Sequence, residues 1–132
     1  RLLGLDAVYL RDISQLKSMS ESEKPCIFIT RRAKFIGCQR TLTIHSESAR
    51  KQVTELKDHL KPLIERSKVL NRCIECNVLL EEVDRADVEH RVPEFVYHHY
   101  KRFKKCPSCK RIYWEGSHAK HMNDLLKELL DY

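Results

Sequence analysis

Six cysteines are the residues of this 132-residue chain whose spacing most clearly indicates chemistry. Four of them form two C-x-x-C pairs, separated by the 29 residues of 77–105. A two-residue gap lets the chain turn so that both thiolates face one tetrahedral ion, and two such knuckles complete an S₄ site suited to Zn²⁺. Four thiolates leave no open coordination position, so this zinc would fold a segment and catalyse nothing. The predicted ligands of one structural Zn²⁺ are Cys73, Cys76, Cys106 and Cys109.

Other assignments for these side chains are less favoured. A thioredoxin-like redox motif is the rival for either pair alone, but it needs a strand-then-helix setting that neither pair has. Cys26 lies in an apolar run and is predicted to be a small buried residue, and Cys38 is predicted to be a free thiol. The histidines that could replace one cysteine ligand are His98, His99, His118 and His121.

Positive charge is the second chemical feature. The net charge is +6, and two stretches, 31–40 and 101–111, contain basic residues without any acid, so we expect no local neutralisation of their charge. Such stretches favour an anionic partner, and nucleic acid is the predicted one. Aromatic residues near the second stretch either stack on bases or pack the ribbon core; they are Phe103, Tyr113 and Trp114. The candidate RNA-binding residues are Arg31, Arg32, Lys34, Arg40, Lys101, Arg102, Lys104, Lys105, Lys110, Arg111 and His118.

Composition excludes several classes of protein. At 42% hydrophobic residues the chain is neither disordered nor fibrous. No apolar run approaches the roughly 20 residues of a membrane span, and the first residues lack a signal-peptide pattern. Six cysteines without a secretory signal indicate the cytoplasm or another reducing intracellular compartment. The chain starts with Arg1, and Arg1–Gly4 resembles the last turn of a helix, so we expect a helix and a strand upstream.

The first half has an α/β pattern. Strands are predicted at 5–10, 26–30 and 41–44, and the second is a continuous apolar run typical of a strand buried on both faces of a parallel sheet. Asp12 or Ser14 is expected to cap a short helix towards Met19. From Glu47 the apolar residues recur at helical spacing until Pro62 limits the helix.

The second half combines the cysteine pairs with a terminal helix. Ser117 is its predicted N-cap, and its apolar stripe should pack on the α/β layer; the stripe contains Met122, Leu125, Leu126, Leu129 and Leu130. Between the knuckles, residues 77–96 hold six acids against two basic residues and form an excursion that offers protein contacts. The predicted domains are an α/β part, 1–68, and a zinc ribbon with the helix, 69–132.

Motifs along nearly the whole chain resemble those of the Mut-7 C-terminal RNase domain family. They are Arg1-Leu2-Leu3-Gly4-Leu5-Asp6, Ile29-Thr30-Arg31, Arg72-Cys73-Ile74-Glu75-Cys76-Asn77, Cys106-Pro107-Ser108-Cys109 and Tyr113-Trp114-Glu115-Gly116-Ser117-His118. The resemblance implies a PIN-like nuclease fold over 1–68 that is incomplete at its N-terminal end, joined to a zinc ribbon. It also implies an RNA ligand and a cluster of carboxylates that hold a divalent metal.

One family carboxylate is replaced in this sequence. The resemblance implies one acid upstream of residue 1 and another after the Thr-Arg pair, where this chain has Arg32. Two like unit charges at about 4 Å repel by about 4 kcal/mol at an effective dielectric near 20, so a guanidinium opposes metal binding there. Asp6 and Asp12 remain, but neither restores such a site by itself.

We therefore expect a non-catalytic, zinc-containing RNA-binding protein that holds structured RNA such as ribosomal RNA or occupies a tRNA site on the ribosome. One alternative is an active metal-dependent ribonuclease. The other is a zinc-stabilised protein-interaction module that uses 77–96 and the leucine stripe. Four thiolates and one Zn²⁺ together carry −2, so the metallated chain would carry about +4 instead of +6.

Overall fold

The structure is a computed structural model that describes residues 1–12, 14–15, 19, 21, 25–35, 40–65 and 68–131. It contains two compact units. The α/β unit is Val8–His59, and the ribbon unit combines Arg1–Ala7 with Leu60–Tyr132. These units are groups of residues in contact and not separate domains, so the domain boundary predicted after residue 68 stays a prediction. No helix in the described part of the chain is long and apolar enough to span a bilayer.

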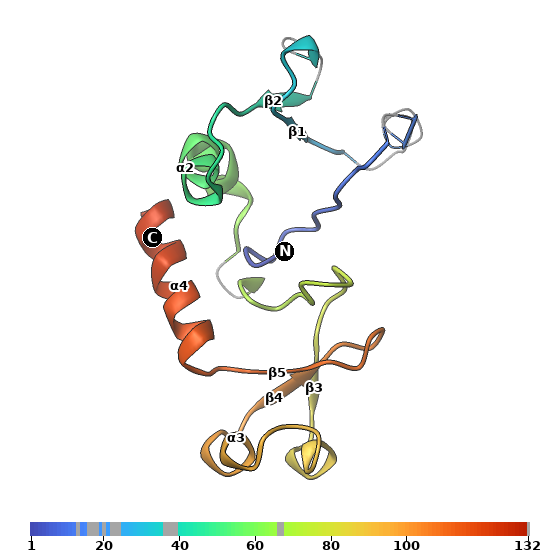
Figure 1. Cartoon of the computed structure of the whole chain (residues 1–132), viewed down its shortest axis with the longest axis vertical. Helices are drawn as coiled ribbons and strands as arrows, with labels where there is room; N and C mark the ends of the chain where they lie inside the picture. Colours follow the sequence, from blue (N-terminus) through green and yellow to red (C-terminus); the bar gives the residue numbers. More distant parts are fainter. Residues whose placement is uncertain are drawn as a thin grey trace. The chain divides into compact units, whose positions relative to one another are not determined.

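Two parallel strands form the sheet of the α/β unit. Strand β1 (Phe28–Thr30) pairs with β2 (Thr41–Thr43), with Ile29 opposite Leu42 (Figure 1). This confirms the predicted parallel sheet, although both strands are shorter than predicted. Burial of β1 on both faces is wrong, because Ile27 and Ile29 are 52% and 48% exposed. Cys26 is half-buried instead of buried.

Helix α2 (Ala49–Leu60) confirms the predicted change to helical spacing. It buries Leu56 and continues into the 3-10 helix Lys61–Leu63, where Pro62 removes a backbone donor. Glu55 on α2 holds the loop that follows β2, because its carboxylate accepts the backbone N–H of His45 and of Ser46, each at 2.8 Å, and the Ser46 hydroxyl. The Ser46 hydroxyl first, and then the two N–H groups, hold the pKa of Glu55 below its ordinary value.

The strand predicted at 5–10 does not form. Tyr9 is 80% exposed, and the backbone N–H of Ala7 donates to the side-chain oxygen of Asn77 at 3.2 Å instead of to a strand. A strand needs a neighbour to accept its ladder hydrogen bonds, which apolar composition alone does not supply. Asp12 accepts the N–H of Ser14 at 3.0 Å, as expected of a cap. Most of the helix expected towards Met19, and Cys38 with it, lies outside the described residues.

An antiparallel sheet organises the ribbon unit. Its order is β3 (Glu81–Val83), β4 (Phe103–Lys105) and β5 (Ile112–Trp114), and β5 leads into α4 (Ser117–Leu130) (Figure 1). Between β3 and β4 lie the 3-10 helix Arg85–Val88 and α3 (Glu94–His99).

The predicted terminal helix is confirmed as α4, with a different cap. Gly116 occupies the N-cap position without a side-chain hydrogen bond, so the N-cap assignment of Ser117 is wrong: this residue is the first of the helix. Leu126 and Leu130 are buried on the predicted stripe. Packing of this stripe on the α/β layer stays a prediction.

Two small apolar clusters stabilise the ribbon unit. One contains Cys73, Leu80 and Cys106, with Tyr113 packed against it. The other contains Val88, Val96 and Phe103; its half-buried neighbours are Val83, Val92, Tyr97, Tyr100, Ile112 and Trp114. The aromatic residues considered for base stacking therefore pack the ribbon core, and Phe103 is only 2% exposed.

Candidate zinc centre and basic surfaces

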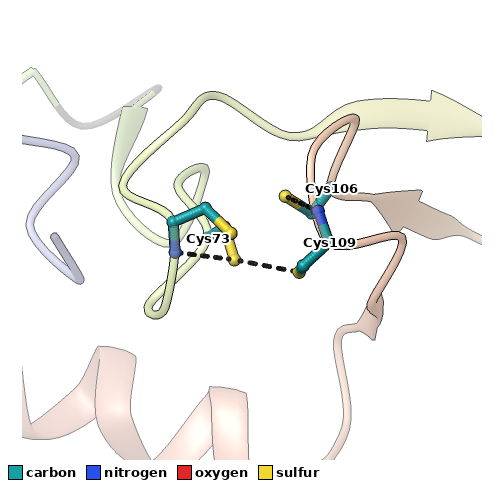
Figure 2. A group of neighbouring side chains, drawn as sticks. Cys73, Cys106 and Cys109 are labelled. Carbon is teal, nitrogen blue, oxygen red and sulfur yellow. Dashed lines mark hydrogen bonds between the residues drawn. The ribbon is translucent and has the colours of Figure 1, made fainter.

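The four cysteines of the two C-x-x-C pairs lie together. Their sulfur atoms all lie within 4.8 Å of one another, and the Sγ atoms of Cys73 and Cys109 are 3.7 Å apart (Figure 2). A tetrahedral ion with Zn–S bonds of about 2.3 Å requires sulfur separations of about 3.8 Å. The five described cysteines form no disulfide. The donor set and its spacing therefore fit one Zn²⁺ held by Cys73, Cys76, Cys106 and Cys109.

The two knuckles have the same backbone geometry. In the first, the N–H of Cys73 donates to the carbonyl of Val78 at 2.9 Å, and the N–H of Asn77 donates to the carbonyl of Cys73 at 2.8 Å. In the second, Cys106 donates to Arg111 at 2.9 Å, and Lys110 donates to Cys106 at 3.0 Å. Each knuckle is therefore a closed turn that fixes the position of its first cysteine.

In each knuckle, the backbone N–H of the second cysteine also points at the sulfur of the first cysteine. The N–H of Cys76 lies 3.4 Å from the sulfur of Cys73, and the N–H of Cys109 lies 3.4 Å from that of Cys106. The following residues, Asn77 and Lys110, have φ angles of 62° and 65°, the left-handed conformation that closes both turns. Hydrogen bonds to sulfur favour the thiolates that zinc requires.

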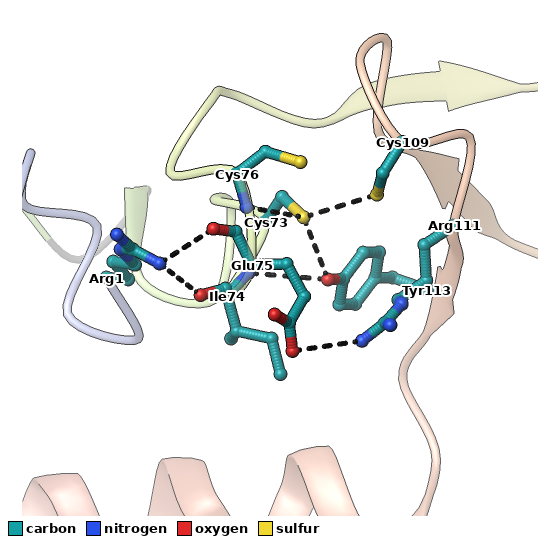
Figure 3. Close-up of polar contacts among 8 residues, drawn as sticks. All are labelled: Arg1, Cys73, Ile74, Glu75, Cys76, Cys109, Arg111 and Tyr113. Atoms are coloured by element: carbon teal, nitrogen blue, oxygen red, sulfur yellow. Dashed lines mark hydrogen bonds and ion pairs between the residues drawn. The ribbon is translucent and has the colours of Figure 1, made fainter.

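Tyr113 on β5 joins the first knuckle from the opposite side of the site. Its hydroxyl oxygen lies 3.2 Å from the sulfur of Cys73 and accepts the N–H of Ile74 at 3.3 Å (Figure 3). When Cys73 is a thiolate, as zinc requires, its sulfur has no proton and the Tyr113 hydroxyl is the donor of this contact. Tyr113 therefore fixes the position of the Cys73 sulfur through a contact outside the metal ligands.

The thiols have pKa values displaced in opposite directions. Burial raises the pKa of Cys73, but hydrogen bonds from Tyr113 and from the N–H groups of Cys76 and Glu75 together lower it to about 6. At Cys109 the N–H of Arg111 favours the thiolate, but burial and the three neighbouring sulfurs raise the pKa to about 11. Four sulfur atoms this close together do not all become thiolates unless a cation compensates their negative charge, and a zinc ion would supply that positive charge.

Residues 1–7 are hydrogen-bonded to the first knuckle. The guanidinium of Arg1 donates to the carbonyls of Ile74 and Glu75 at 2.5 and 2.9 Å (Figure 3). Asn77 donates from its side-chain nitrogen to the carboxylate of Asp6 at 2.7 Å. Asp6, one of the acids that remained as a nuclease candidate, is therefore a partner of the zinc knuckle.

The first basic stretch follows β1. Arg31 and Arg32 leave the carboxyl end of this strand, and Lys34 lies on the 3-10 helix Ala33–Phe35; all three are exposed. Arg31 pairs with Glu47 at 3.1 Å, and the N–H of Arg32 donates to the Thr30 hydroxyl at 3.1 Å. Arg40 precedes β2, and since the strands are parallel it stands at their opposite end.

The second basic stretch has acidic neighbours that its sequence does not reveal. Arg102 pairs with Glu82 at 2.7 Å, and Arg111 with Glu75 at 3.5 Å. The expectation that no acid neutralises this stretch locally is wrong, because the pairing of β3 with β4 brings Glu82 beside it and the first knuckle brings Glu75.

The lysines of this stretch differ in their surroundings. Lys104 stands opposite Glu82 in the sheet and donates to Asn71 at 2.9 Å, and Lys105 stands opposite Glu81. Within the described residues no carboxylate pairs with Lys101 or Lys110, although Lys110 donates to the carbonyl of Pro107 at 2.7 Å. Among the lysines of this stretch, these two therefore have no carboxylate opposite or paired with them.

The histidines lie outside the sulfur cluster. His118 is exposed in the first turn of α4, and none of the four candidate histidines joins the cysteines. Sequence reasoning missed Phe95, which is 70% exposed and stacks on His99. The sequence did contain a signal for this stack, because Phe95 and His99 are two flat rings spaced four residues apart on one helix.

Comparison with known proteins gives one family. The Mut7-C RNAse domain family matches residues 1–126. No curated protein and no solved structure matches the chain. The match covers nearly the whole chain, including both cysteine pairs and both basic stretches, and so the protein belongs to the Mut7-C RNase domain family.

Proposed function

We propose that this chain binds RNA through cationic side chains and does not cleave it with a divalent metal. Membership of a ribonuclease family supports RNA as the ligand. The observation that carries the second half is Arg32, an exposed cation at the carboxyl end of β1, where the family resemblance implies a carboxylate.

The carboxylates near this edge have other partners. Arg31 binds Glu47, and the loop after β2 donates hydrogen bonds to Glu55. Across the described residues, the four cysteines are the one group of three or more metal-ligating side chains close enough to share an ion. The described residues bring together no carboxylate cluster of the kind that positions Mg²⁺ against a phosphate, and this supports binding without cleavage.

The exposed cations following β1 suit contact with a phosphate backbone. A guanidinium forms paired hydrogen bonds to phosphate oxygens, and each contact releases counterions. Arg31 gives up only a weak partner, since its pair with Glu47 is exposed to solvent on both sides. On the ribbon, Lys101 and Lys110 are the stronger candidates, because Arg102 and Arg111 already bind acids.

The finer features of the proposal follow from the family. The two-stranded parallel sheet with α2 would belong to a PIN-like layer, and the zinc ribbon would present the second basic surface. Structured RNA, such as ribosomal RNA or a tRNA site on the ribosome, fits a small basic chain. The absence of disulfides among the five described cysteines supports the cytoplasm or another reducing compartment.

The binding test measures affinity for a structured RNA by fluorescence anisotropy at several salt concentrations. Joint replacement of Arg31, Arg32 and Lys34 by Ala should weaken binding about tenfold or more and reduce the slope against log salt by about 2. Lys51→Ala with Lys120→Ala removes exposed cations elsewhere and should leave the affinity nearly unchanged. Equal losses in the two variants would contradict a specific basic surface.

Metal-dependent ribonuclease activity is the second candidate, and the family match favours it. It requires carboxylates that the described residues do not bring together. The two functions differ in one outcome: the nuclease would convert RNA to products in Mn²⁺ and lose this activity in EDTA, whereas the binding protein would leave RNA intact in both.

A further inference from the structure

Helix α3 places an aromatic ring in solvent although an apolar core lies on its other side. Phe95 is 70% exposed, whereas the adjacent Val96 is 9% exposed and packs with Val88 and Phe103. An isolated exposed apolar residue needs no explanation, but this one belongs to an ordered stack of rings.

The ring of Phe95 is held by its neighbours. Its centroid lies 5.2 Å from that of His99, one helical turn later, and the two planes are inclined by only 16°. His99 in turn meets the edge of Tyr100 at 4.8 Å and 78°, and Tyr100 packs against the ribbon core. The stack fixes a flat apolar surface in advance, so that ordering it on binding costs little entropy.

We propose that Phe95, supported by His99, is a stacking platform for a base of single-stranded RNA. This inference rests on the proposed RNA-binding function. It adds a contact with the face of a base to the contacts that the cationic side chains make with phosphates. Aromatic and imidazole rings are the usual partners of unstacked bases, and such stacking tolerates any base because every base has a π-face.

The charged residues before and after α3 indicate the path of the RNA backbone away from Phe95. The exposed Lys101 follows two residues after His99, and no carboxylate of the described residues pairs with it. Before α3 in the chain, Asp84 and Asp87 are exposed at the 3-10 helix Arg85–Val88, and their charges repel phosphate. The RNA backbone should therefore leave the platform towards Lys101, away from the acidic part of the excursion.

The same charges argue against contact through phosphate alone. Glu94 lies next to Phe95 in the chain and approaches His98 at 3.8 Å. A neutral, flat contact at Phe95 is consistent with a partly acidic surrounding, whereas a phosphate contact at this point is not.

The test is anisotropy of a labelled oligouridine of about 12 nucleotides with the zinc-loaded full chain. Phe95→Ala should weaken binding by about 5- to 150-fold without changing the salt slope. Phe95→Trp should preserve the affinity, and Phe95→Leu should resemble Ala because it keeps apolar area but loses the ring. Tyr9→Ala removes another ring, 80% exposed, and should have no effect.

Each contrary result has a distinct meaning. Unchanged affinity in Phe95→Ala, with the wild type still bound, overturns the platform alone and leaves the proposed RNA binding standing. A loss that comes with a smaller salt slope shows a phosphate contact and also overturns the platform. Failure of the wild-type chain to bind any RNA overturns the proposed function itself.

Discussion

The hydroxyl oxygen of Tyr113 lies 3.2 Å from the sulfur of Cys73, a residue 40 positions earlier in the chain. The same oxygen accepts the N–H of Ile74, so β5 contacts the first knuckle at two points. Burial, and then the hydrogen bond to Cys73, raise the pKa of Tyr113 to about 12, so it keeps its proton and remains a donor over the whole physiological range.

Removing this hydroxyl should weaken zinc binding. Tyr113→Phe keeps the ring in its cluster but leaves the Cys73 sulfur without its donor, and such outer contacts are typically worth about 10- to 100-fold in metal affinity. Competition with a chromogenic chelator measures the change. Tyr97→Phe, which alters a ring of the other cluster, is the matched control. Equal zinc affinities for the two variants would show that the Tyr113 contact is incidental.

Loss of one predicted ligand should unfold the ribbon unit. Cys106→Ser leaves three thiolates, and structural zinc contributes about 10 kcal/mol or more to folding in small domains. We expect loss of bound zinc in native mass spectrometry and loss of dispersed amide signals from 69–131. Cys26→Ser should retain its zinc, because Cys26 lies outside the sulfur cluster. A Cys106→Ser chain that keeps its metal and its melting curve would refute the assignment.

Glu55 should make the α/β unit sensitive to acid. Its carboxylate has a pKa below the ordinary 4.5, so its stabilising effect is full above that value and is lost as the pH falls through the lowered one. Glu55→Gln should therefore unfold at lower urea concentration at neutral pH, and the difference from wild type should vanish in acid. Glu47→Gln, in an exposed pair, should change little. A difference that persists unchanged in acid would contradict this role.

Glu82 should restrain RNA binding at the ribbon. Its pair with Arg102 neutralises one cation of the second basic stretch, so Glu82→Gln should tighten RNA binding by a few-fold and steepen the salt slope. Glu89→Gln makes the same charge change on the same excursion at an acid that pairs with no Lys or Arg of the described chain. If both variants tighten binding equally, only net charge matters and Arg102 is not a contact.

The zinc site was predictable because its geometry is local. A C-x-x-C pair fixes one turn, and the observed bonds within each knuckle span five residues or fewer. Helix α4 was predictable for the same reason, since its apolar stripe repeats at helical spacing. The left-handed φ of Asn77 suits its residue type, whereas that of Lys110 has no signal in its side chain.

Features that depend on distant partners were not predictable. The apolar residues around Tyr9 suggested a strand, but no neighbour pairs with them among the described residues. The pair of Arg102 with Glu82, which are 20 positions apart in the chain, arises from the register of β3 on β4, which composition does not encode. Phe95 was missed because burial, not residue type, separates it from Phe103.

The most direct measurement is cleavage of a labelled structured RNA by the full-length, zinc-loaded protein in Mn²⁺ and in EDTA, beside binding of the same RNA. Binding without product formation in either condition is predicted, and Arg32→Asp should weaken the binding. Conversion of the RNA to products in Mn²⁺ by the wild-type chain, abolished by EDTA, would contradict the account and establish a nuclease that does not need a carboxylate at Arg32.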